Sequence, residues 1–587
     1  MLGRKGYILG INFAYHQPSA CLVKEGYVIA AVEEERFNRH KGGKETHVDN
    51  TLILPFASID YVLKAGGIGI DQVSVIGTSF SPKRRRAFRH IWAKHPPLLS
   101  GEYETPEGDA EFCRLLNLAP QVLAGRFGLN PQKTALHFKA VPHHVAHIAS
   151  SYYASPFETA AAVCLDGIGE LESACIANCD GADINILEKV DYPHSLGLVW
   201  EVITNYLGFK GNHDESKVMG LAAYGDPAAH RKAMGEIIQV LGEGRFTTKL
   251  DEGVLRHDYA VMEKLFSVPR RLPQEPLSWN DGKNDHANIA AALQEKTNEI
   301  FLNLAARARE RTGRKHLVMA GGCTLNCVAN GIVAEKSGFE DLYVQPAAGD
   351  AGTSVGAALY LEYQLNKREK RQVFGMPTAF VGPSYTDQEI AQALKKHHLQ
   401  GAKIADPVLA AVDLLAEGKI IGWFQGRMEF GPRALGNRSL LANPMLADIR
   451  ETLNVKVKHR EEFRPFCPAI LAEEAAAWVE HEKPLCFASR YMLATYKLRA
   501  EKRGTVPAVI HLDGSARIQN LHRDDNPLYH DLLQAFFRRT GIPMLLNTSF
   551  NDSEPIVCSP DDACQCFLKT KIDAMIIGDY LVVHAAR

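Results

Sequence analysis

One strand pattern occurs twice in the first third of the chain. At Ile8–Val23 and again at Ala161–Ala177, an apolar strand leads through a turn containing Asn12 or Asp166 into a second strand that carries Ser-Ala-Cys. A pattern repeated in this way indicates an internal duplication of one supersecondary unit. We therefore expect an α/β chain in which two similar lobes face each other across a cleft.

Glycine-rich turns follow two further buried strands. Leu317–Ala320 ends in Gly321 and Gly322, and Leu342–Gln345 ends in a stretch of small residues that contains Asp350. Small residues between a strand and a helix let backbone amides approach a ligand at the helix N-terminus, which is typical of nucleotide sites. These turns therefore favour a nucleotide-binding chain.

Three histidines lie in the stretch Val-Pro-His-His-Val-Ala-His at residues 141–147. Pro142 suits the first position of a helix, because its missing N–H would have no partner there. His143 and His147 then stand one helical turn apart on one face, and two imidazoles so placed can share a metal ion. His144 and His147 could also meet, and a helix that merely carries three solvated or core histidines is the alternative.

Two carboxylates stand at strand ends where they could complete such a site. Asp166 directly follows the strand Ala160–Leu165, and Asp350 follows the later strand. A turn aspartate that hydrogen-bonds its own backbone is the alternative for Asp166. With His143 and His147, the two carboxylates would form a site that suits Fe(II), Mn(II) or Zn(II), and the sequence does not choose among these ions.

Basic residues are concentrated in one segment of the second half. Eight arginines and lysines and five acidic residues lie between Arg427 and Arg464, among glycines and prolines that shape loops. Clustered guanidinium groups suit polyphosphate, because each can bind two oxygens. The alternatives are an RNA-facing patch or a solvated surface. Further on, an apolar strand ends in Asn-Thr-Ser-Phe-Asn at 547–551, a polar cluster that could hydrogen-bond phosphate.

Two helical segments are expected outside these motifs. Asp285–Thr312 has helical periodicity, and Gly313 suits the position just past its end. Residues 81–128, which include several prolines, are expected to be a helical insertion. The charge run Lys83–Arg86 at its start is expected to be a solvated face.

Composition argues against several classes of protein. At 587 residues the chain is too long for one ordinary hydrophobic core, so about two to four domains are expected. The formal net charge of −2 argues against a dedicated nucleic-acid binder. No apolar run approaches the roughly 18 residues of a membrane span. The twelve cysteines form no CxxC…CxxC array and are expected to be buried thiols of a cytoplasmic protein.

Taken together, these stretches resemble the NodU/CmcH family of O-carbamoyltransferases. The match covers nearly the whole chain in the family's order, and its most specific element is Phe-Gly-Pro-Arg-Ala-Leu-Gly-Asn-Arg-Ser at 430–439. The other matching stretches are residues 143–147, 166–170, 217–222, 321–326, 349–350, 464–466 and 546–550. Two residues depart from the family's pattern, Ser216 in place of Gly and Cys467 in place of Ala, and neither is expected to touch a proposed ligand.

The resemblance implies an α/β chain of two domains. Residues 1–365 would form an actin/Hsp70-type duplicated ATPase fold, as in threonylcarbamoyl transferases, with the metal site. Residues 366–380 would be a linker, and residues 381–587 would form a YrdC-like α/β domain. The implied enzyme takes carbamoyl phosphate and ATP and forms a carbamoyl-adenylate in the second domain with release of pyrophosphate. It then transfers the carbamoyl group, in the first domain, to a hydroxyl of a small-molecule natural product.

The resemblance also implies roles for particular residues. The metal, expected to be Fe(II), would be bound by His143, His147, Asp166 and Asp350. The contacts to carbamoyl phosphate map onto Arg433, Lys458, Arg464, Ser549 and Asn551. The residues expected around the nucleotide are Lys217, Gly321, Gly322 and Asn326. His16, in the first strand-end turn, is the candidate for holding the carbamoyl group or acting as base.

Two other functions remain open at this point. A threonylcarbamoyl-type tRNA-modifying enzyme would use the same two folds, but the near-neutral charge and the arginine loop argue against it. A non-catalytic nucleotide-binding regulator would use the ATPase fold as a switch, and the intact metal and arginine motifs weigh against it. The expected partner is a small-molecule hydroxyl acceptor, with no nucleic acid or membrane, and a homodimer is one option for the oligomeric state.

Overall fold

The structure is a computed structural model that describes residues 6–87, 105–129, 137–249, 259–366, 371–481 and 483–584. It divides into two compact units. One comprises Met1–Asn38 and Gly42–Pro377, and the other comprises Arg39–Lys41 and Thr378–Arg587. Of the expected linker, residues 367–370 lie outside the described ranges, and the domain boundaries taken from the sequence stay a prediction.

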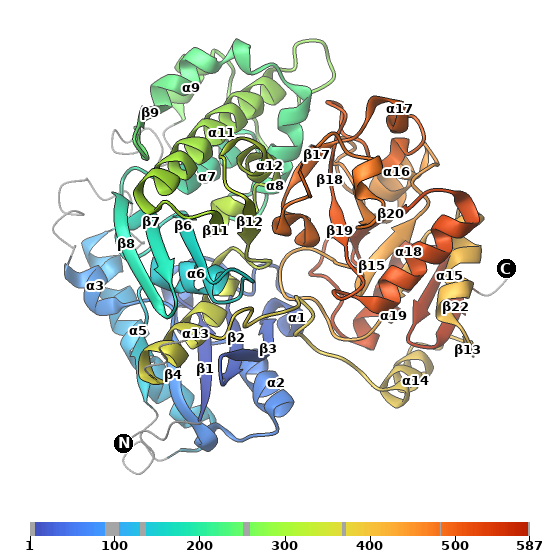
Figure 1. Cartoon of the computed structure of the whole chain (residues 1–587), viewed down its shortest axis with the longest axis horizontal. Coiled ribbons are helices and arrows are strands. Elements are labelled where there is room, and N and C mark those ends of the chain that lie inside the picture. The colour runs from blue at the N-terminus through green and yellow to red at the C-terminus, as the bar shows by residue number, and fades with distance from the viewer. Residues whose placement is uncertain are drawn as a thin grey trace. The chain divides into compact units, whose positions relative to one another are not determined.

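The first unit contains two five-stranded sheets, which are seen in Figure 1. Their strands are β1 (Tyr7–Asn12), β2 (Ser19–Lys24), β3 (Tyr27–Glu33), β4 (Val73–Thr78), β5 (Phe138–Ala140), β6 (Thr159–Leu165), β7 (Glu172–Asp180), β8 (Asp183–Asp191), β11 (His316–Ala320) and β12 (Asp341–Val344). One sheet has the order β3-β2-β1-β4-β5, and the other has the order β8-β7-β6-β11-β12. In each, three antiparallel strands are followed by two that run parallel to the first. This shared topology confirms the duplication expected from the repeated pattern.

Helices surround these sheets. They are α1 (Glu35–Asn38), α2 (Phe56–Gly66), α3 (Pro82–Ala87), α5 (Pro106–Arg126), α6 (His143–Tyr152), α7 (Leu196–Tyr206), α8 (Glu215–Leu221), α9 (Arg231–Ile237), α10 (Ala260–Phe266), α11 (Asp285–Thr312), α12 (Cys327–Lys336) and α13 (Thr353–Asn366). A separate hairpin is formed by β9 (Ile238–Gly242) and β10 (Arg245–Thr248). The bounds of α11 confirm the sequence expectation, and the left-handed Gly313 that follows, with φ 61°, ends the helix.

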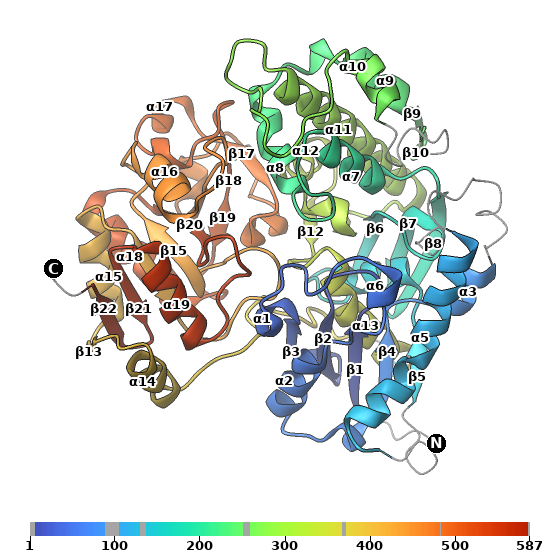
Figure 2. The ribbon, with the colours of Figure 1, turned by 180° about the vertical axis from the view of Figure 1, so that it is seen from behind.

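Two glycines let α13 lie directly against α6 and the first sheet. A Cβ at Gly356 would lie 1.7 Å from the carbonyl oxygen of Ala146 in α6, and one at Gly10 in β1 would lie 1.9 Å from the carbonyl oxygen of Ser354 in α13. Helix α13 packs on β1 and β2, whereas α6 packs on β6 and β11. Figure 2 shows the two helices side by side, and this pair joins the two lobes.

One local expectation is wrong, and the solvated face expected for the charge run holds only in part, since Lys83 and Arg86 are exposed but Arg85 is not. Pro142 has φ −56° and ψ 139°, so it precedes the helix instead of opening it, and α6 begins at His143. In the charge run, Arg85 is buried, and its guanidinium donates two hydrogen bonds of 2.9 Å to the carboxylate of Asp109 in α5. Pairing allows an arginine to be buried, and its partner here lies on another helix. Of the expected helical insertion, residues 88–104 lie outside the described ranges.

The second unit is built on an eight-stranded mixed sheet. Its strands are β13 (Gly401–Lys403), β14 (Ile421–Phe424), β15 (Arg438–Ala442), β16 (Cys467–Leu471), β19 (Gln519–Leu521), β20 (Met544–Ser549), β21 (Ala574–Ile577) and β22 (Tyr580–Val583), in the order β13-β22-β21-β14-β15-β20-β16-β19. The other elements are α14 (Asp387–Lys396), α15 (Pro407–Ala416), α16 (Ile449–Glu451), β17 (Thr495–Lys497), α17 (Ala500–Arg503), β18 (Ser515–Arg517), α18 (Pro527–Thr540) and α19 (Pro560–Thr570). Helices α15 and α18 pack on each other and on the sheet. The mixed α/β class is thus confirmed, whereas the YrdC-like assignment stays a prediction.

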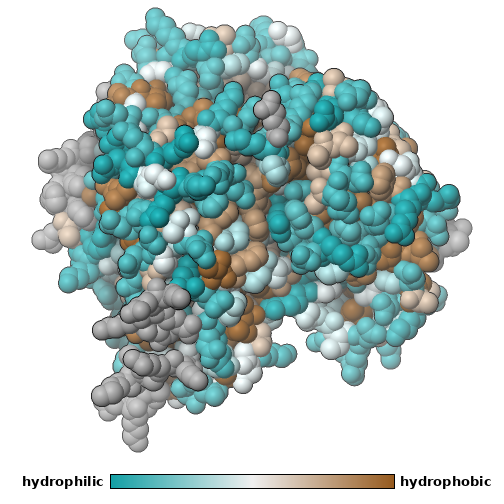
Figure 3. Space-filling view, viewed as in Figure 1, coloured by the Kyte–Doolittle hydropathy of each residue, from teal (hydrophilic) through white to brown (hydrophobic). Residues whose placement is uncertain are grey.

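The apolar residues of the chain are largely internal. Hydrophilic residues cover most of the face seen in Figure 3. All twelve cysteines are free thiols, and eleven of them are buried, as expected. Within the described part of the chain, no helix has both the length and the apolar composition needed to cross a membrane.

Gly356→Ala should lower the thermal midpoint of unfolding. The new Cβ would meet backbone atoms of α6, which can relieve the clash only by moving, and overpacking of this kind destabilises by about 1–3 kcal/mol. The matched control is Gly125→Ala in α5, where a Cβ would have nothing within 4 Å, so the midpoint should stay or rise. Equal midpoints for the two variants, measured by scanning calorimetry, would contradict the close packing of α13 on α6.

Candidate functional site

Helix α6 carries His143 and His147 into the protein interior. Both side chains are fully buried, and their Nε2 atoms lie 3.2 Å apart. The start of the helix is held by Glu170, whose carboxylate accepts the backbone N–H of His143 at 3.0 Å and that of Ser81 at 2.7 Å. A carboxylate at a helix N-terminus satisfies free N–H groups and complements the helix dipole. Glu170 thereby fixes the position from which the histidines project.

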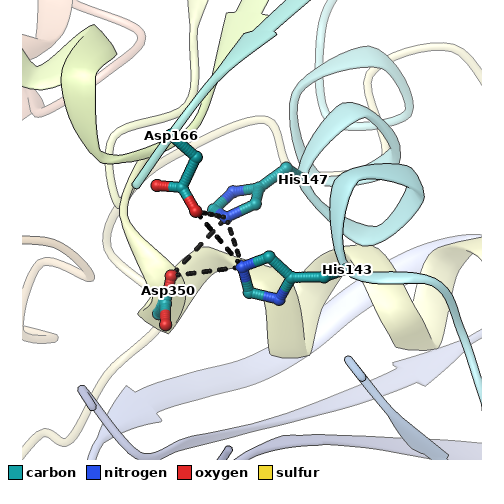
Figure 4. Close-up of side chains that lie close together, drawn as sticks. All are labelled: His143, His147, Asp166 and Asp350. Atoms are coloured by element: carbon teal, nitrogen blue, oxygen red, sulfur yellow. Dashed lines mark hydrogen bonds and ion pairs between the residues drawn. The ribbon is translucent and has the colours of Figure 1, made fainter. Parts of the chain in front are cut away.

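Asp166 and Asp350 reach the same point from two strand ends. Asp166 follows β6, and Asp350 opens a 3-10 turn after β12; since β6, β11 and β12 are parallel, their carboxyl ends meet at one edge of the sheet. Nε2 of His143 lies 3.3 Å from Oδ2 of Asp166 and 3.5 Å from Oδ1 of Asp350. Nε2 of His147 lies 3.6 Å from each of the same two oxygens. Figure 4 shows the four side chains pointing toward one another.

The hydrogen bonds around these side chains fit a bound cation. Nδ1 of His143 lies 3.0 Å from the carbonyl oxygen of Ser79, and a carbonyl only accepts, so Nδ1 carries a proton. In the neutral ring Nε2 then turns its lone pair toward the carboxylates. Electron-rich atoms gathered within 4.8 Å in a buried space repel one another unless a positive charge lies among them. Two imidazoles and two carboxylates suit Fe(II), Mn(II) or Zn(II), and a histidine bonded through its other nitrogen to a carbonyl is usual at metal sites.

The pKa shifts of His143 and Asp166 also indicate that this group of side chains favours a positive charge. Burial opposes the charged form of His143, but Asp350 and Asp166 outweigh it and raise the pKa of the imidazole well above 6.5. Burial also opposes ionisation of Asp166, but His147 and His143 outweigh it and hold the pKa of that carboxyl well below its usual range. The group is therefore stable only when negative carboxylates face a positive neighbour.

The structure distinguishes the three histidines that spacing left open. Among the described residues, His143 and His147 form the potential metal-binding group with the two aspartates, and His144 is not part of it. The His144 ring is buried with no hydrogen-bond partner for either nitrogen in the described part of the chain. Burial, followed by the neighbouring His143, lowers the pKa of His144 to about 3. His144 is therefore neutral.

His16 lies at the edge of this group. Its Nε2 is 3.8 Å from Oδ2 of Asp350, and 27% of its side chain is exposed. Asn12, at the end of β1, donates from its amide to the carbonyl oxygen of His16 at 2.9 Å and so holds the turn. His16 is thus accessible from solvent and adjacent to a buried carboxylate.

The backbone N–H groups of Gly321 and Gly322 form hydrogen bonds inside the protein. The N–H of Gly322 donates to Oδ1 of Asp166 at 2.7 Å, and that of Gly321 donates to the carbonyl oxygen of Ala348 at 2.9 Å. Gly321 has φ 99°, and a Cβ there would lie 2.4 Å from the carbonyl oxygen of Leu165. The glycine turn therefore packs on the end of β6 and orients Asp166, while its nucleotide role stays a prediction.

Asn326 and Lys217 are also engaged. Asn326 caps α12 by accepting the N–H of Ala329 at 3.0 Å, and its amide donates to Gln294 at 2.9 Å. Lys217 in α8 forms an ion pair of 3.1 Å with Asp214. Neither side chain meets the metal-binding group, and their predicted contacts to the nucleotide stay untested.

In the second unit, three of the five residues predicted to bind carbamoyl phosphate meet. Lys458 is buried, and its ammonium donates to Oδ1 of Asn551 at 2.7 Å, to Oγ of Ser549 at 3.3 Å and to the carbonyl oxygen of Ser549. Burial, followed by the nearby Arg460, lowers the pKa of Lys458 well below 10.5. A cationic lysine in this place requires a negative partner.

Arginines gather beside this lysine, and the sequence singled out only one of them. Burial, followed by Arg464, lowers the pKa of Arg460 to about 9, and Arg517 acts in the same direction. Arg460 lies in the basic run, whereas Arg517 lies outside it, so no spacing signal could have found it. Nε of Arg517 donates to Sγ of Cys467 at 2.8 Å. This departure from the family pattern therefore contacts an arginine that was not among the residues predicted to bind carbamoyl phosphate.

Arg433 lies in the loop between β14 and β15. One oxygen of Glu429 accepts three backbone N–H groups of this loop, at distances between 2.6 and 3.3 Å. Asn547 in β20 donates to the carbonyl oxygen of Ala434 at 3.3 Å, so the loop lies against the strand that ends at Ser549. The loop that carries Arg433 is thus held by Glu429 and packs against β20.

Lys44 is a buried lysine that the sequence did not single out. It is 3% exposed, and its ammonium donates to the carbonyl oxygens of Phe13 at 2.6 Å and Asn50 at 2.8 Å. Burial lowers the pKa of Lys44 to about 7, and Asp350 opposes that shift. Lys44 follows two glycines, and nothing in the neighbouring sequence indicates that it is buried.

Comparisons with known proteins agree along the chain. A family model described as carbamoyltransferase N-terminus matches residues 7–359, and one described as carbamoyltransferase C-terminus matches residues 412–584. The chain is 36% identical to nodulation protein NolNO of Sinorhizobium fredii, over 97% of this chain and 79% of that protein. It is 33% identical to the uncharacterized protein sll1178 of Synechocystis, over 99% of this chain and 97% of that protein. The 3'-hydroxymethylcephem-O-carbamoyltransferase of Amycolatopsis lactamdurans is 32% identical over 62% of this chain and 64% of its own length.

Asp350→Asn and His147→Asn should weaken metal binding by about tenfold or more, because each removes a ligand without enlarging the side chain. The measurement is equilibrium dialysis against Fe(II), Mn(II) and Zn(II) with elemental analysis. The control is His144→Asn on the same helix turn, which should bind the ion like the wild type. Equal metal content in all four proteins would rule out a site at these residues.

The stability contribution of Lys44 should depend on pH. The pKa of Lys44 is about 7 in the folded protein, against the ordinary lysine value of 10.5 in the unfolded chain. Between these two pH values the unfolded chain binds more protons than the folded protein, so the free energy of unfolding rises with pH. Lys44→Met lacks this gain. Its melting temperature relative to wild type should therefore be highest near pH 7 and fall toward pH 10. Lys64→Met, at an exposed position in α2, should show a constant difference, and a constant difference for Lys44→Met would refute the lowered pKa.

Proposed function

Since this chain belongs to the carbamoyltransferase family and is an enzyme of that class, we propose that it is an ATP-dependent O-carbamoyltransferase. It would use carbamoyl phosphate and ATP to form a carbamoyl-adenylate and then transfer the carbamoyl group to a hydroxyl of a small molecule. One relative is named as an O-carbamoyltransferase acting on a hydroxymethyl group, which supports transfer to oxygen.

The observation that carries the proposal is the basic cluster of the second unit. Lys458 is buried and, within the described part of the chain, has only neutral oxygens as hydrogen-bond partners. Arg460 and Arg464 lie near enough to disfavour its charge further. A buried cation beside two guanidinium groups is stabilised by an anion with several oxygens, and a phosphate supplies them.

In the second unit the proposed reaction is activation. The basic groups would bind the phosphate of carbamoyl phosphate and neutralise charge while water cleaves its bond to the carbamoyl group, which releases phosphate and carbamate. A carbamate oxygen would then attack the α-phosphorus of ATP, and the bond from that phosphorus to pyrophosphate would break. The polar side chains of Ser549 and Asn551, which hold Lys458, would keep its ammonium directed at the anion.

In the first unit the proposed reaction is transfer to the hydroxyl. His143, His147, Asp166 and Asp350 would hold a divalent metal, proposed to be Fe(II), which when bound would supply Lewis-acid polarisation and charge for orienting phosphate. His16 is proposed to take the hydroxyl proton, since it is partly exposed and close to Asp350. The carbamoyl carbon would bond to the acceptor oxygen, and AMP would leave.

The finer fold assignments are part of this proposal. The same strand order in both lobes of the first unit supports an actin/Hsp70-type ATPase fold, in which a nucleotide binds between duplicated lobes. For the second unit, we propose a YrdC-like adenylate-forming domain on the basis of its mixed sheet and basic cluster.

Lys458→Met should reduce carbamoyl phosphate-dependent exchange between ATP and labelled pyrophosphate by about 100-fold or more, because it removes a preorganised cation from the reacting phosphate. Lys456→Met is the matched control, since Lys456 is exposed two residues away and should retain exchange. Absence of exchange in the wild type, or normal exchange in Lys458→Met, would contradict the proposed activation step.

A further inference from the structure

A cavity of about 190 Å³ lies in the first lobe, apart from the residues already assigned. Its walls come from the residues that follow β1 and β4, from β5, and from α5. Since β1, β4 and β5 run parallel, the cavity lies at their common carboxyl edge. Ligands of open α/β sheets commonly bind at that edge.

The walls of the cavity are mainly apolar. The larger side chains are those of Phe13, Phe80, Phe138 and Leu116. The hydroxyl of Ser79 donates to Oδ1 of Asn12 at 3.1 Å and is therefore already occupied. Such a lining favours an apolar surface, because burying a polyol here would leave hydroxyls without partners.

Asn117, an exposed residue of α5, brings one side-chain amide to the lining of the cavity. Asn117 in α5 donates from its amide to the carbonyl oxygen of Cys113 at 2.7 Å. Its Oδ1 receives no hydrogen bond from the described residues. A single acceptor in an otherwise apolar pocket can orient a ligand through one donor group.

The cavity adjoins the groups proposed for transfer. Ser79 lines it, and the carbonyl oxygen of Ser79 lies 3.0 Å from Nδ1 of His143. The ring centroid of Phe80, also in the wall, lies 6.1 Å from that of His143. On the other side Asn12, bonded to Ser79, holds the carbonyl oxygen of His16. Ser79 therefore separates the cavity from His143, and Ser79 and Asn12 separate it from the backbone of His16.

We propose that this cavity is the acceptor pocket and takes one six-membered ring of an aromatic or cyclic alcohol, an inference that rests on the proposed function. Volume sets the limit of one ring, because an apolar cavity of about 150 Å³ holds benzene. The ring packs between the phenylalanines, and the hydroxyl on its substituent is directed to the side of His16.

Direct binding tests the pocket without any turnover. Saturation-transfer NMR on the full-length enzyme measures the affinity for benzyl alcohol, 1-naphthylmethanol and glycerol. The wild type should bind benzyl alcohol about tenfold or more tightly than either of the others. Equal binding of benzyl alcohol and 1-naphthylmethanol, or of benzyl alcohol and glycerol, would overturn the proposal.

Two filling variants locate the binding. Ala119→Phe narrows the cavity from α5, and Ala14→Leu narrows it from the turn after β1. If Ala119→Phe does not fold, Ala14→Leu tests the proposal. Each should weaken binding of benzyl alcohol by about tenfold or more, whereas Gln121→Phe, on the exposed face of α5, should not. Unchanged binding in a folded filling variant would overturn the proposal. The pyrophosphate exchange of the wild type tests the proposed function separately, because it needs no acceptor.

Discussion

The buried meeting of two carboxylates with two imidazoles is the interaction on which the first unit depends. Asp166 and Asp350 are charged groups inside the protein, and their oxygens lie within 3.6 Å of both histidine Nε2 atoms. Such a group persists only if its geometry is held from outside and its charge is balanced. The N–H of Gly322 holds Asp166, the carbonyl of Ser79 orients His143, and Glu170 anchors the helix.

The duplicated topology explains why these supports converge. Each lobe presents the carboxyl ends of parallel strands at one edge, and α13 and α6 bring the two lobes together without intervening side chains at Gly356. Asp166 and Asp350 come from the second sheet, whereas Ser79 and His16 come from strand ends of the first. The candidate site is therefore a product of both lobes, and the adjoining cavity belongs to the first.

The second unit gathers positively charged groups, whereas the first gathers carboxylates. Neutral oxygens hold Lys458, the thiol of Cys467 holds Arg517, and Arg460 interacts electrostatically with both Lys458 and Arg517. Burial, and after it repulsion between neighbouring cations, lowers the pKa of Lys458 and of Arg460, so a bound anion would stabilise their charged forms. The first unit thus gathers negative charge that its proposed ligand, a cation, would neutralise. The second gathers positive charge that a phosphate would neutralise.

The sequence by itself determined the features that depend on local spacing. The repeated strand pattern predicted the duplication, periodicity predicted α11, and the i,i+4 spacing allowed His143 and His147 to meet. Only the tertiary structure decided which histidines meet the aspartates, that Arg85 is paired with Asp109, that Gly322 serves Asp166, and that Lys44 and Arg517 are placed beside charged groups. The reason is physical: helix and strand patterns follow from neighbouring residues, whereas burial and charge balance depend on partners that the fold brings from distant parts of the chain.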